Sequence, residues 1–228
     1  MDSQSFSQGV SFVLSIKDEV VTSLWQTAVM VGVSTVASVI FGGLLGVLLF
    51  VTGKGRFLDH KRAHVLLGQV VNFMRAFPFV ILVIALTDVT RAVTGTVIGP
   101  IAAAFVLSVS GVFYFARLVE QNLSEVPRGV VEAAEAMGAG PAKIVFGVLL
   151  TESRSGLALS VTILIIALLS ESAAAGMIGG GGLGDLAIRY GHYRYQTSVI
   201  VFVVATLSIL VIAIQALGNK AADALDKR

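Results

Sequence analysis

The sequence predicts an all-α integral membrane protein with five transmembrane helices, and three features lead to this fold class. Hydrophobic residues make up 56% of the 228 residues, and mean hydropathy is +0.90. Only 13% of residues are charged, against about 25% in a soluble domain. The charges also stand in short clusters between five apolar runs, each long enough for the roughly 20 residues that cross a bilayer. Lipid is therefore the expected solvent for most of the surface.

The five apolar runs predict the boundaries of the spans. The first run has no charge over 34 residues, which suits one long tilted helix and is too short for two helices and a turn. The second run contains one charge, Arg75, and the fourth contains one, Glu171. We expect spans near residues 22–52, 66–88, 95–117, 156–177 and 197–218, preceded by an N-terminal segment (1–21) and followed by a cytoplasmic tail (219–228).

The distribution of Lys and Arg predicts the orientation of the chain. Cytoplasmic loops carry an excess of these residues. Eleven of the sixteen lie in the link between the first two spans, in the link between spans three and four, and in the tail. Four lie in the remaining loops and one, Arg75, lies within a span. We therefore expect the N-terminus outside and the C-terminus in the cytoplasm.

The ends of the spans carry weaker signals. Trp25 and three tyrosines, Tyr190, Tyr193 and Tyr195, fit an interfacial aromatic belt on the outer side. The first 21 residues lack a basic start and a cleavage motif, so no removable signal peptide is expected. Their apolar residues recur at near-helical spacing, which fits an interfacial helix or a frayed terminus: Phe6, Val10, Val13, Leu14 and Val21.

The link between spans three and four has a helical pattern of its own. Pro127 stands where a helix can begin, and residues 131–137 include strong helix formers. Gly138 is a C-terminal cap, and Pro141 stops the helix and starts a new one. The pattern predicts a short, stiff cytoplasmic helix, which can transmit movement from a partner in which it is docked.

This link resembles the EAA loop of ABC-importer permeases. Glu132-Ala133-Ala134 is followed by three residues, Gly138, nine residues and Val148-Leu149-Leu150. The family pattern ends in Ile-any-Leu-Pro, so Val148 and Thr151 depart from it. The resemblance implies that the helix docks into a cleft on a separate ATPase subunit. The contact residues would be Glu132, Ala133, Ala134, Glu135, Met137 and Gly138.

Other stretches resemble methionine-importer permeases. Residues 75–79, Arg-Ala-Phe-Pro-Phe, are similar to an Arg-Ser-any-Pro-Phe stretch of amino-acid importers, and the Gly-rich run 172–190 and residues 115–120 are similar to methionine permeases. This resemblance implies a multi-pass permease of the bacterial inner membrane that imports an amino acid. The similarity to methionine permeases makes methionine the expected solute. It implies a homodimer, two ATPase subunits that bind ATP and Mg, and a periplasmic or lipoprotein binding protein. The chain has no P-loop motif, so no cofactor is expected on it.

The departures from the methionine pattern fall at the expected gate. Ala174 stands where that family has a Met implicated in closing the pathway, and Met177 follows one turn later. Phe113 stands where those permeases often have Pro. We expect these three residues, with Glu171, to form the pathway or gate. Glu171 either faces the pathway and binds a ligand ammonium group or snorkels to the outer interface.

Arg75 and several glycines are expected to shape the backbone or its packing. Pro78 is expected to kink span two, and Arg75 either reaches the cytoplasmic interface or pairs with Glu135 or Glu152. The spacing of Gly42 and Gly46 favours close helix packing, within the chain or across a dimer. Turn residues are expected in the Gly-rich run: Gly179, Gly182 and Gly184.

After that turn, Asp185 and Arg189 are expected to pair on a short outer helix, which is either a contact for the binding protein or a structural loop. The three histidines, His60, His64 and His192, are too scattered to predict a metal site, and there is no cysteine.

Three alternative functions stay open from the sequence. A permease of this architecture can carry another amino acid or a betaine. A transporter that needs no ATPase is the second alternative, although it should show internal repeats, which the sequence lacks. An assembly scaffold is the third. In each case we expect the chain to perform no covalent chemistry. We also expect it to bind no nucleic acid, because its basic residues form no stripe.

Overall fold

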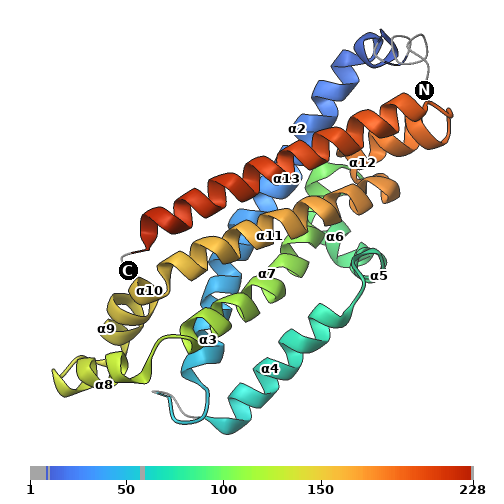
Figure 1. The fold of residues 1–228 in the computed structure, drawn as a ribbon. Coiled ribbons are helices and arrows are strands. Elements are labelled where there is room, and N and C mark those ends of the chain that lie inside the picture. Colours follow the sequence, from blue (N-terminus) through green and yellow to red (C-terminus); the bar gives the residue numbers. More distant parts are fainter. Residues whose placement is uncertain (1–8, 10, 57–59, 227–228) are drawn as a thin grey trace. The chain divides into compact units, whose positions relative to one another are not determined.

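The computed structural model describes residues 9, 11–56 and 60–226, and all regular secondary structure among them is helical (Figure 1). The chain forms two compact units. Unit 1 comprises residues 1–35, 78–109 and 165–214, and unit 2 comprises residues 36–77, 110–164 and 215–228.

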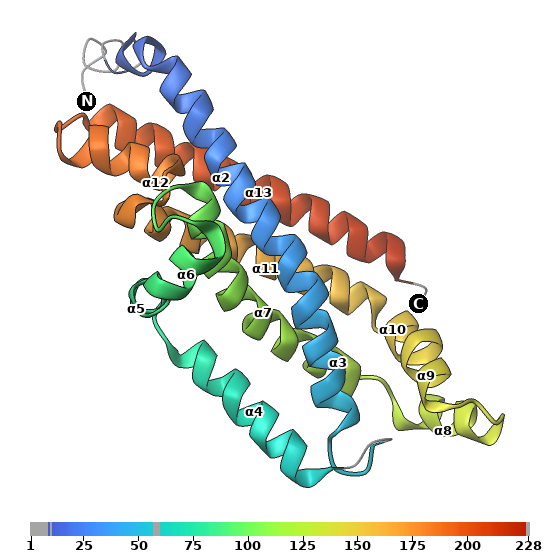
Figure 2. The same cartoon turned by 180° about the vertical axis from the view of Figure 1, so that it is seen from behind.

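The first predicted span is a single long helix. Helix α2 (Lys17–Ala37) continues through the π-helical segment η1 (Ser38–Gly42) into α3 (Gly43–Val51), as Figure 2 shows. Together they form a 35-residue apolar segment, which confirms one helix in place of two. Of the residues that suggested a preceding helix, Phe6 and Val10 lie outside the described residues, and Val13 packs against the core of unit 1.

The second predicted span is broken at Pro78, the residue expected to kink it, so residues 66–88 form two helices. Helix α4 (Lys61–Ala76) ends before Phe77, and α5 (Phe79–Ala85) begins after Pro78. Both intervening residues are extended, with ψ of 129° and 134°. Pro78 lacks an N–H and disfavours helical geometry in the residue before it, so the helix stops. In the described residues, four helices alone can cross a membrane, and a fifth span requires counting α4 and α5 as one.

The remaining spans exist but begin or end away from their predicted limits. Helix α6 (Thr87–Thr94) lies between α5 and the third span, α7 (Pro100–Ser124). Gly95 and Gly99 lie between α6 and α7 and adopt positive φ values of 77° and 98°, so the chain is not helical there. The fourth span is α11 (Arg154–Ala175) with the π-helical η3 (Gly176–Gly180). The fifth, α13 (Thr197–Leu225), runs seven residues past its expected end.

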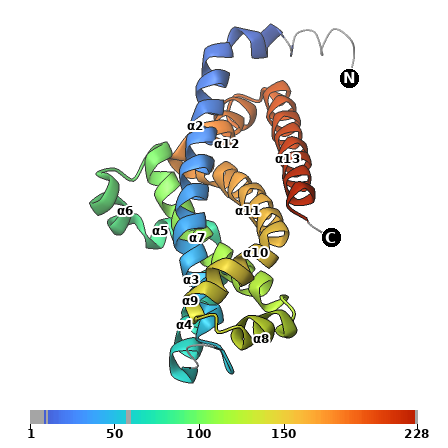
Figure 3. The same ribbon diagram turned by 90° about the vertical axis from the view of Figure 1, so that its left-hand side faces the viewer.

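The short helix expected between spans three and four is present. Helix α8 (Arg128–Ala136) begins directly after Pro127, and Gly138 follows it with φ of 78°. The chain then forms α9 (Pro141–Lys143), the π-helical η2 (Ile144–Leu149) and α10 (Leu150–Glu152). Helix α8 lies beside η2 in Figure 3. The predicted order of helix, glycine and second helix is confirmed.

Each unit has its own apolar core. In unit 1, residues of α2, α12 (Gly182–Leu186), η4 (Ala187–His192) and α13 pack together: Val20, Leu183, Leu186, Tyr190, Val199 and Val203. In unit 2, Leu49, Val71 and Ala116 join α3, α4 and α7. Gly42 and Gly46 permit the close approach of α3 and α7, because a Cβ on Gly46 would lie 2.5 Å from the Ala116 carbonyl oxygen. The close packing predicted for this pair of glycines thus occurs within the chain.

Candidate functional site

Helix α8 has one buried side and one exposed side. Val131 and Ala134 are buried, and their spacing of three residues places them on the same helical face. The other side is exposed and carries Glu132, Ala133, Glu135, Ala136 and Met137. Met137 is 81% exposed, which is unusual for a large apolar side chain outside an apolar span. This exposed face is the part of α8 that a partner protein can contact.

Ala134 does not belong to that face, although the sequence pattern placed it among the contact residues. Its side chain is 4% exposed. Helix α8 packs against η2 of the same chain, and Ala134 is buried within this loop. Ala134 therefore contributes to packing within the loop and not to its exposed face. Spacing alone could not distinguish Ala134 from Ala133, because the burial depends on where η2 lies.

Gly138 ends α8 in a hydrogen-bonded turn. Its N–H donates to the Glu135 carbonyl (2.8 Å), and the Ala139 N–H donates to the Ala134 carbonyl (3.0 Å). The positive φ of 78° favours glycine, and no atom lies within 4 Å of the place a Cβ would occupy. Gly138 is thus required for backbone conformation rather than for space.

The C-terminal end of α13 is fastened to the start of α11 in unit 2. Arg154 Nε donates to the Leu225 carbonyl (2.7 Å), and Ser155 Oγ donates to the Ala222 carbonyl (3.0 Å). Ala222 is 3% exposed. A cation at a helix C-terminus satisfies carbonyls that lack partners within the helix and complements the helix dipole. These bonds explain why α13 continues into the stretch that the sequence assigned to a tail.

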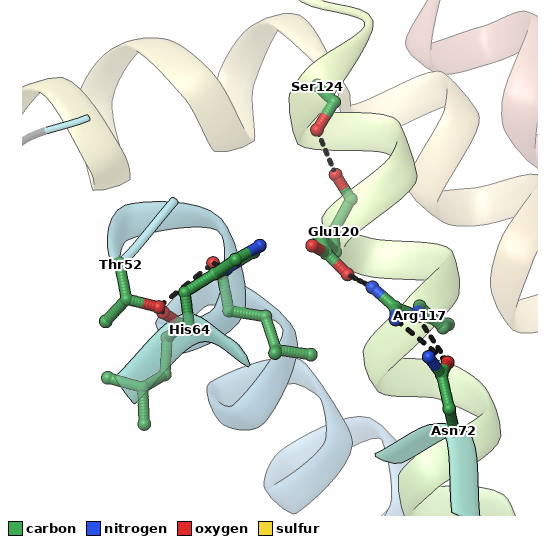
Figure 4. Close-up of polar contacts among 8 residues, drawn as sticks. Thr52, His64, Asn72, Arg117, Glu120 and Ser124 are labelled. Carbon is green, nitrogen blue, oxygen red and sulfur yellow. Dashed lines mark hydrogen bonds and ion pairs between the residues drawn. The ribbon is translucent and has the colours of Figure 1, made fainter. Parts of the chain in front are cut away.

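A polar network joins α4 to α7, and sequence reasoning did not predict it. Arg117 Nη2 donates to Asn72 Oδ1 (2.8 Å), and Arg117 Nη1 forms an ion pair with Glu120 (Figure 4). Ser124 Oγ donates to the Glu120 backbone carbonyl (2.8 Å). Nearby on α3 and α4, His64 Nδ1 donates to the Leu49 carbonyl (3.1 Å). The i, i+3 spacing of Arg117 and Glu120 was the available signal for their pairing.

Arg75 is exposed at the end of α4, where its guanidinium lies 5.7 Å from the Tyr114 ring centre. The three ion pairs among the described residues do not include it. The alternative in which Arg75 pairs with Glu135 or Glu152 is therefore not observed among the described residues. An Arg over an aromatic face is a cation–π contact, which leaves the outer edge of the guanidinium available to an anion.

The residues expected at a gate fall in two different units. Glu171 and Ala174 of α11 and Met177 of η3 belong to unit 1. Glu171 and Ala174 are half-buried, with the Glu171 Oε2 atom shielded from solvent, and Met177 is 63% exposed. Phe113 belongs to unit 2, where it packs against the Leu49 cluster. Phe113 thus has a packing role that the sequence did not indicate.

The Gly-rich turn is held by α2. Gly179 and Gly182 adopt φ of 92° and 81°, as expected for turn residues. The Gly182 N–H donates to Gln26 Oε1 (2.8 Å), and the Leu183 N–H donates to Thr27 Oγ1 (2.9 Å). These two polar residues of the first span were missed in the sequence, where nothing links them to residues about 156 positions away.

Gly184 has a different role from the turn glycines, because it lies inside α12 at a close contact with α11. A Cβ there would lie 2.1 Å from the Ala173 carbonyl oxygen. The expected turn role thus holds for Gly179 and Gly182, while Gly184 serves packing.

A second polar network in unit 1 ties the start of α2 to η4. Arg189 pairs with Asp185 (2.7 Å), as predicted, and with Glu19 (3.4 Å). The Tyr190 hydroxyl donates to Glu19 Oε1; this hydrogen bond, together with burial, raises the pKa of the phenol.

Tyr190 is 5% exposed, so it is a core residue and not part of an aromatic belt. Trp25, Tyr193 and Tyr195 are exposed, as belt residues would be. In the described part of the chain, no group of three or more His, Asp or Glu side chains is arranged to hold a metal ion.

Comparison with known proteins identifies the family of the chain. Residues 38–228 match the family of binding-protein-dependent transport system inner membrane components. The chain belongs to this family. Family members are multi-pass components of the bacterial inner membrane, and the chain is accordingly an inner membrane component of a transport system.

Several members of this family are similar to the chain over most of its length. The probable D-methionine transport system permease protein MetI of Vibrio cholerae is 42% identical over 92% of this chain and 94% of its own. The methionine import system permease protein MetP of Bacillus subtilis is 40% identical over 79% of this chain and 82% of its own.

The fold is also similar to solved structures. A chain of the MetNI methionine ABC transporter, in an inward-facing conformation, superposes with a TM-score of 0.92 at 37% identity, covering 93% of this chain and 99% of that one. A chain of an amino acid ABC transporter superposes with a TM-score of 0.77 at 15% identity, which shows a shared fold alone.

Proposed function

We propose that the chain is the membrane-spanning permease subunit of an ATP-driven importer whose cargo is methionine. One observation carries the proposal: similarity to methionine permeases extends over nearly the full length of both chains, at 42% identity to MetI of Vibrio cholerae and a TM-score of 0.92 to a MetNI chain. The chain of the amino acid ABC transporter, in contrast, shares only the fold with this chain, at 15% identity.

The exposed face of α8 is the docking surface for a separate ATPase subunit. Glu132, Ala133, Glu135 and Met137 lie on this face. The apolar Met137 suits a desolvated contact, and the carboxylates suit its polar rim. ATP and Mg²⁺ bind to the ATPase, because this chain has no P-loop sequence. Two copies of the chain, two ATPase subunits and an external binding protein make up the complex, with the N-terminus outside and the C-terminus in the cytoplasm.

Movement passes from the ATPase to the spans through short, stiff elements. Helix α8 is joined to α11 by the Gly138 turn and three consecutive helical segments, α9, η2 and α10. When the ATPase subunits close on ATP, α8 moves with them and α11 follows. The permease alternates between inward-facing and outward-facing states, and Glu171, Ala174 and Met177 of α11 and η3 lie along the pathway that opens and closes.

Competition between solutes tests the cargo. Cells that express the chain with its own ATPase and binding protein should take up radiolabelled L-methionine. A hundredfold excess of unlabelled L-methionine should abolish this uptake, and the same excess of glycine betaine should leave it unchanged. Uptake of methionine that resists unlabelled methionine would overturn the assignment of cargo.

A further inference from the structure

A pocket of about 300 Å³ lies between α4 and α7 in unit 2. Arg75 lines it from α4, and Arg117, Leu118, Glu120, Gln121 and Ser124 line it from α7. The volume falls at the lower end of the roughly 300–1,000 Å³ range of small-molecule sites. Five of its six residues are polar or charged, although α7 is apolar enough to cross a membrane.

Charged groups on a membrane-spanning helix are costly unless they face water, a partner or a ligand. Glu120 and Arg117 pair with each other, and Asn72 fixes the guanidinium of Arg117 from α4. The side chains of Arg117 and Glu120 keep 28% and 15% of their surface exposed. The pocket therefore presents a paired carboxylate and guanidinium, Glu120 and Arg117, together with a second guanidinium, Arg75, that has no ion pair among the described residues.

We propose that this pocket is a binding site for a zwitterionic amino acid on its way through the permease. Arg75 binds the carboxylate of the solute, and Glu120 accepts a hydrogen bond from its ammonium group. This proposal rests on the proposed function, because an importer of amino acids must accommodate both charges of its cargo. Arg75 and Glu120, which carry opposite charges and line the same pocket, supply that match.

A lipid headgroup fits the pocket less well. A bound lipid needs an apolar groove for its acyl chains beside the headgroup site, and Leu118 is the single apolar residue that lines the pocket. A small solute with one positive and one negative group needs no apolar groove beside the pocket.

Binding of radiolabelled L-methionine to the purified permease–ATPase complex in nanodiscs, without the binding protein, tests the site. The wild-type complex should bind L-methionine saturably. Arg75→Gln should weaken binding about tenfold, because a charge-assisted hydrogen bond is lost, and Arg75→Lys should restore part of it. Arg62→Gln is the matched control, since Arg62 is exposed on the same helix but does not line the pocket. Equal binding by all four proteins would overturn the site.

Competitors separate the two charges of the solute. L-Methioninamide lacks the carboxylate and 4-(methylthio)butanoate lacks the ammonium group, so each should compete much more weakly than L-methionine with the wild-type complex. Strong competition by phosphatidylglycerol added to the nanodiscs, with weak competition by methionine, would overturn the proposal in favour of a lipid site. If methionine uptake proceeds normally in cells while the complex shows no binding that depends on Arg75, this inference fails and the proposed function stands.

Discussion

At the scale of single residues, two neighbouring alanines of α8 have opposite environments. Ala133 is exposed, and Ala134 is 4% exposed against the chain itself. The Glu-Ala-Ala pattern treats them alike, because a sequence motif records which residues occur and not which way each side chain faces. Gly138, in contrast, was predictable, since its positive φ follows from the place of a glycine after a helix.

Substitution by tryptophan should separate the roles of these two alanines. Ala133→Trp should leave the permease folded and abolish binding of the ATPase subunit, because the ring occupies the docking face. Ala134→Trp should destabilise the loop itself by about 1–3 kcal/mol, because the buried position has no room for the ring. Co-purification of the ATPase and the melting temperature of the permease in detergent measure the two effects. Retention of the ATPase by Ala133→Trp would contradict the docking face.

At the scale of helices, the apolar runs predicted which segments form spans, and local contacts decided their ends. Pro78 was expected to bend span two, but the extended Phe77 and Pro78 divide it into α4 and α5. The sequence shows where the proline lies. Whether the helix kinks or breaks there depends on whether neighbouring helices satisfy the freed backbone groups. In the same way, α13 continues to Leu225 because Arg154 binds its last carbonyl, a contact between residues 71 positions apart.

Two glycines of the first span should respond differently to an added methyl group. Gly46→Ala should lower the stability of unit 2 by about 1–3 kcal/mol, because the new Cβ would lie 2.5 Å from the Ala116 carbonyl oxygen. Gly32→Ala is the control: nothing lies within 4 Å of its Cβ position, and alanine favours the helix. Thermal unfolding in detergent measures both. Equal melting temperatures for the two variants would show that α3 and α7 are not in close contact.

The end of α13 should loosen when its anchor is removed. Arg154→Ala should speed amide hydrogen exchange of residues 219–226 about fivefold, since a cation at a helix C-terminus contributes about 1 kcal/mol. Lys220→Ala, an exposed position on the same helix, should leave that exchange unchanged. Hydrogen exchange of the intact complex followed by mass spectrometry checks this. Unchanged exchange in Arg154→Ala would mean that the hydrogen bond to Leu225 does not hold the helix end.

At the scale of the whole molecule, the broad function was predictable and the internal arrangement was not. The spacing from Glu132 to Leu150 indicated an ATPase-driven importer, and membership of the inner membrane component family agrees with it. Composition and spacing do not reveal that Phe113 packs in one unit while Glu171 lies in the other. That division depends on the three-dimensional course of α7 and α11, each of which contributes residues to both units.

The dependence of transport on ATP tests the central claim most directly. The chain would be purified in mild detergent with the subunits that accompany it and reconstituted into proteoliposomes with its binding protein. Uptake of L-methionine should require ATP at the side that carries the ATPase and should stop with a non-hydrolysable analogue. Methionine uptake at the same rate without ATP, by a preparation in which no ATPase subunit co-purifies, would contradict the account of this chain as the permease of an ATP-driven importer.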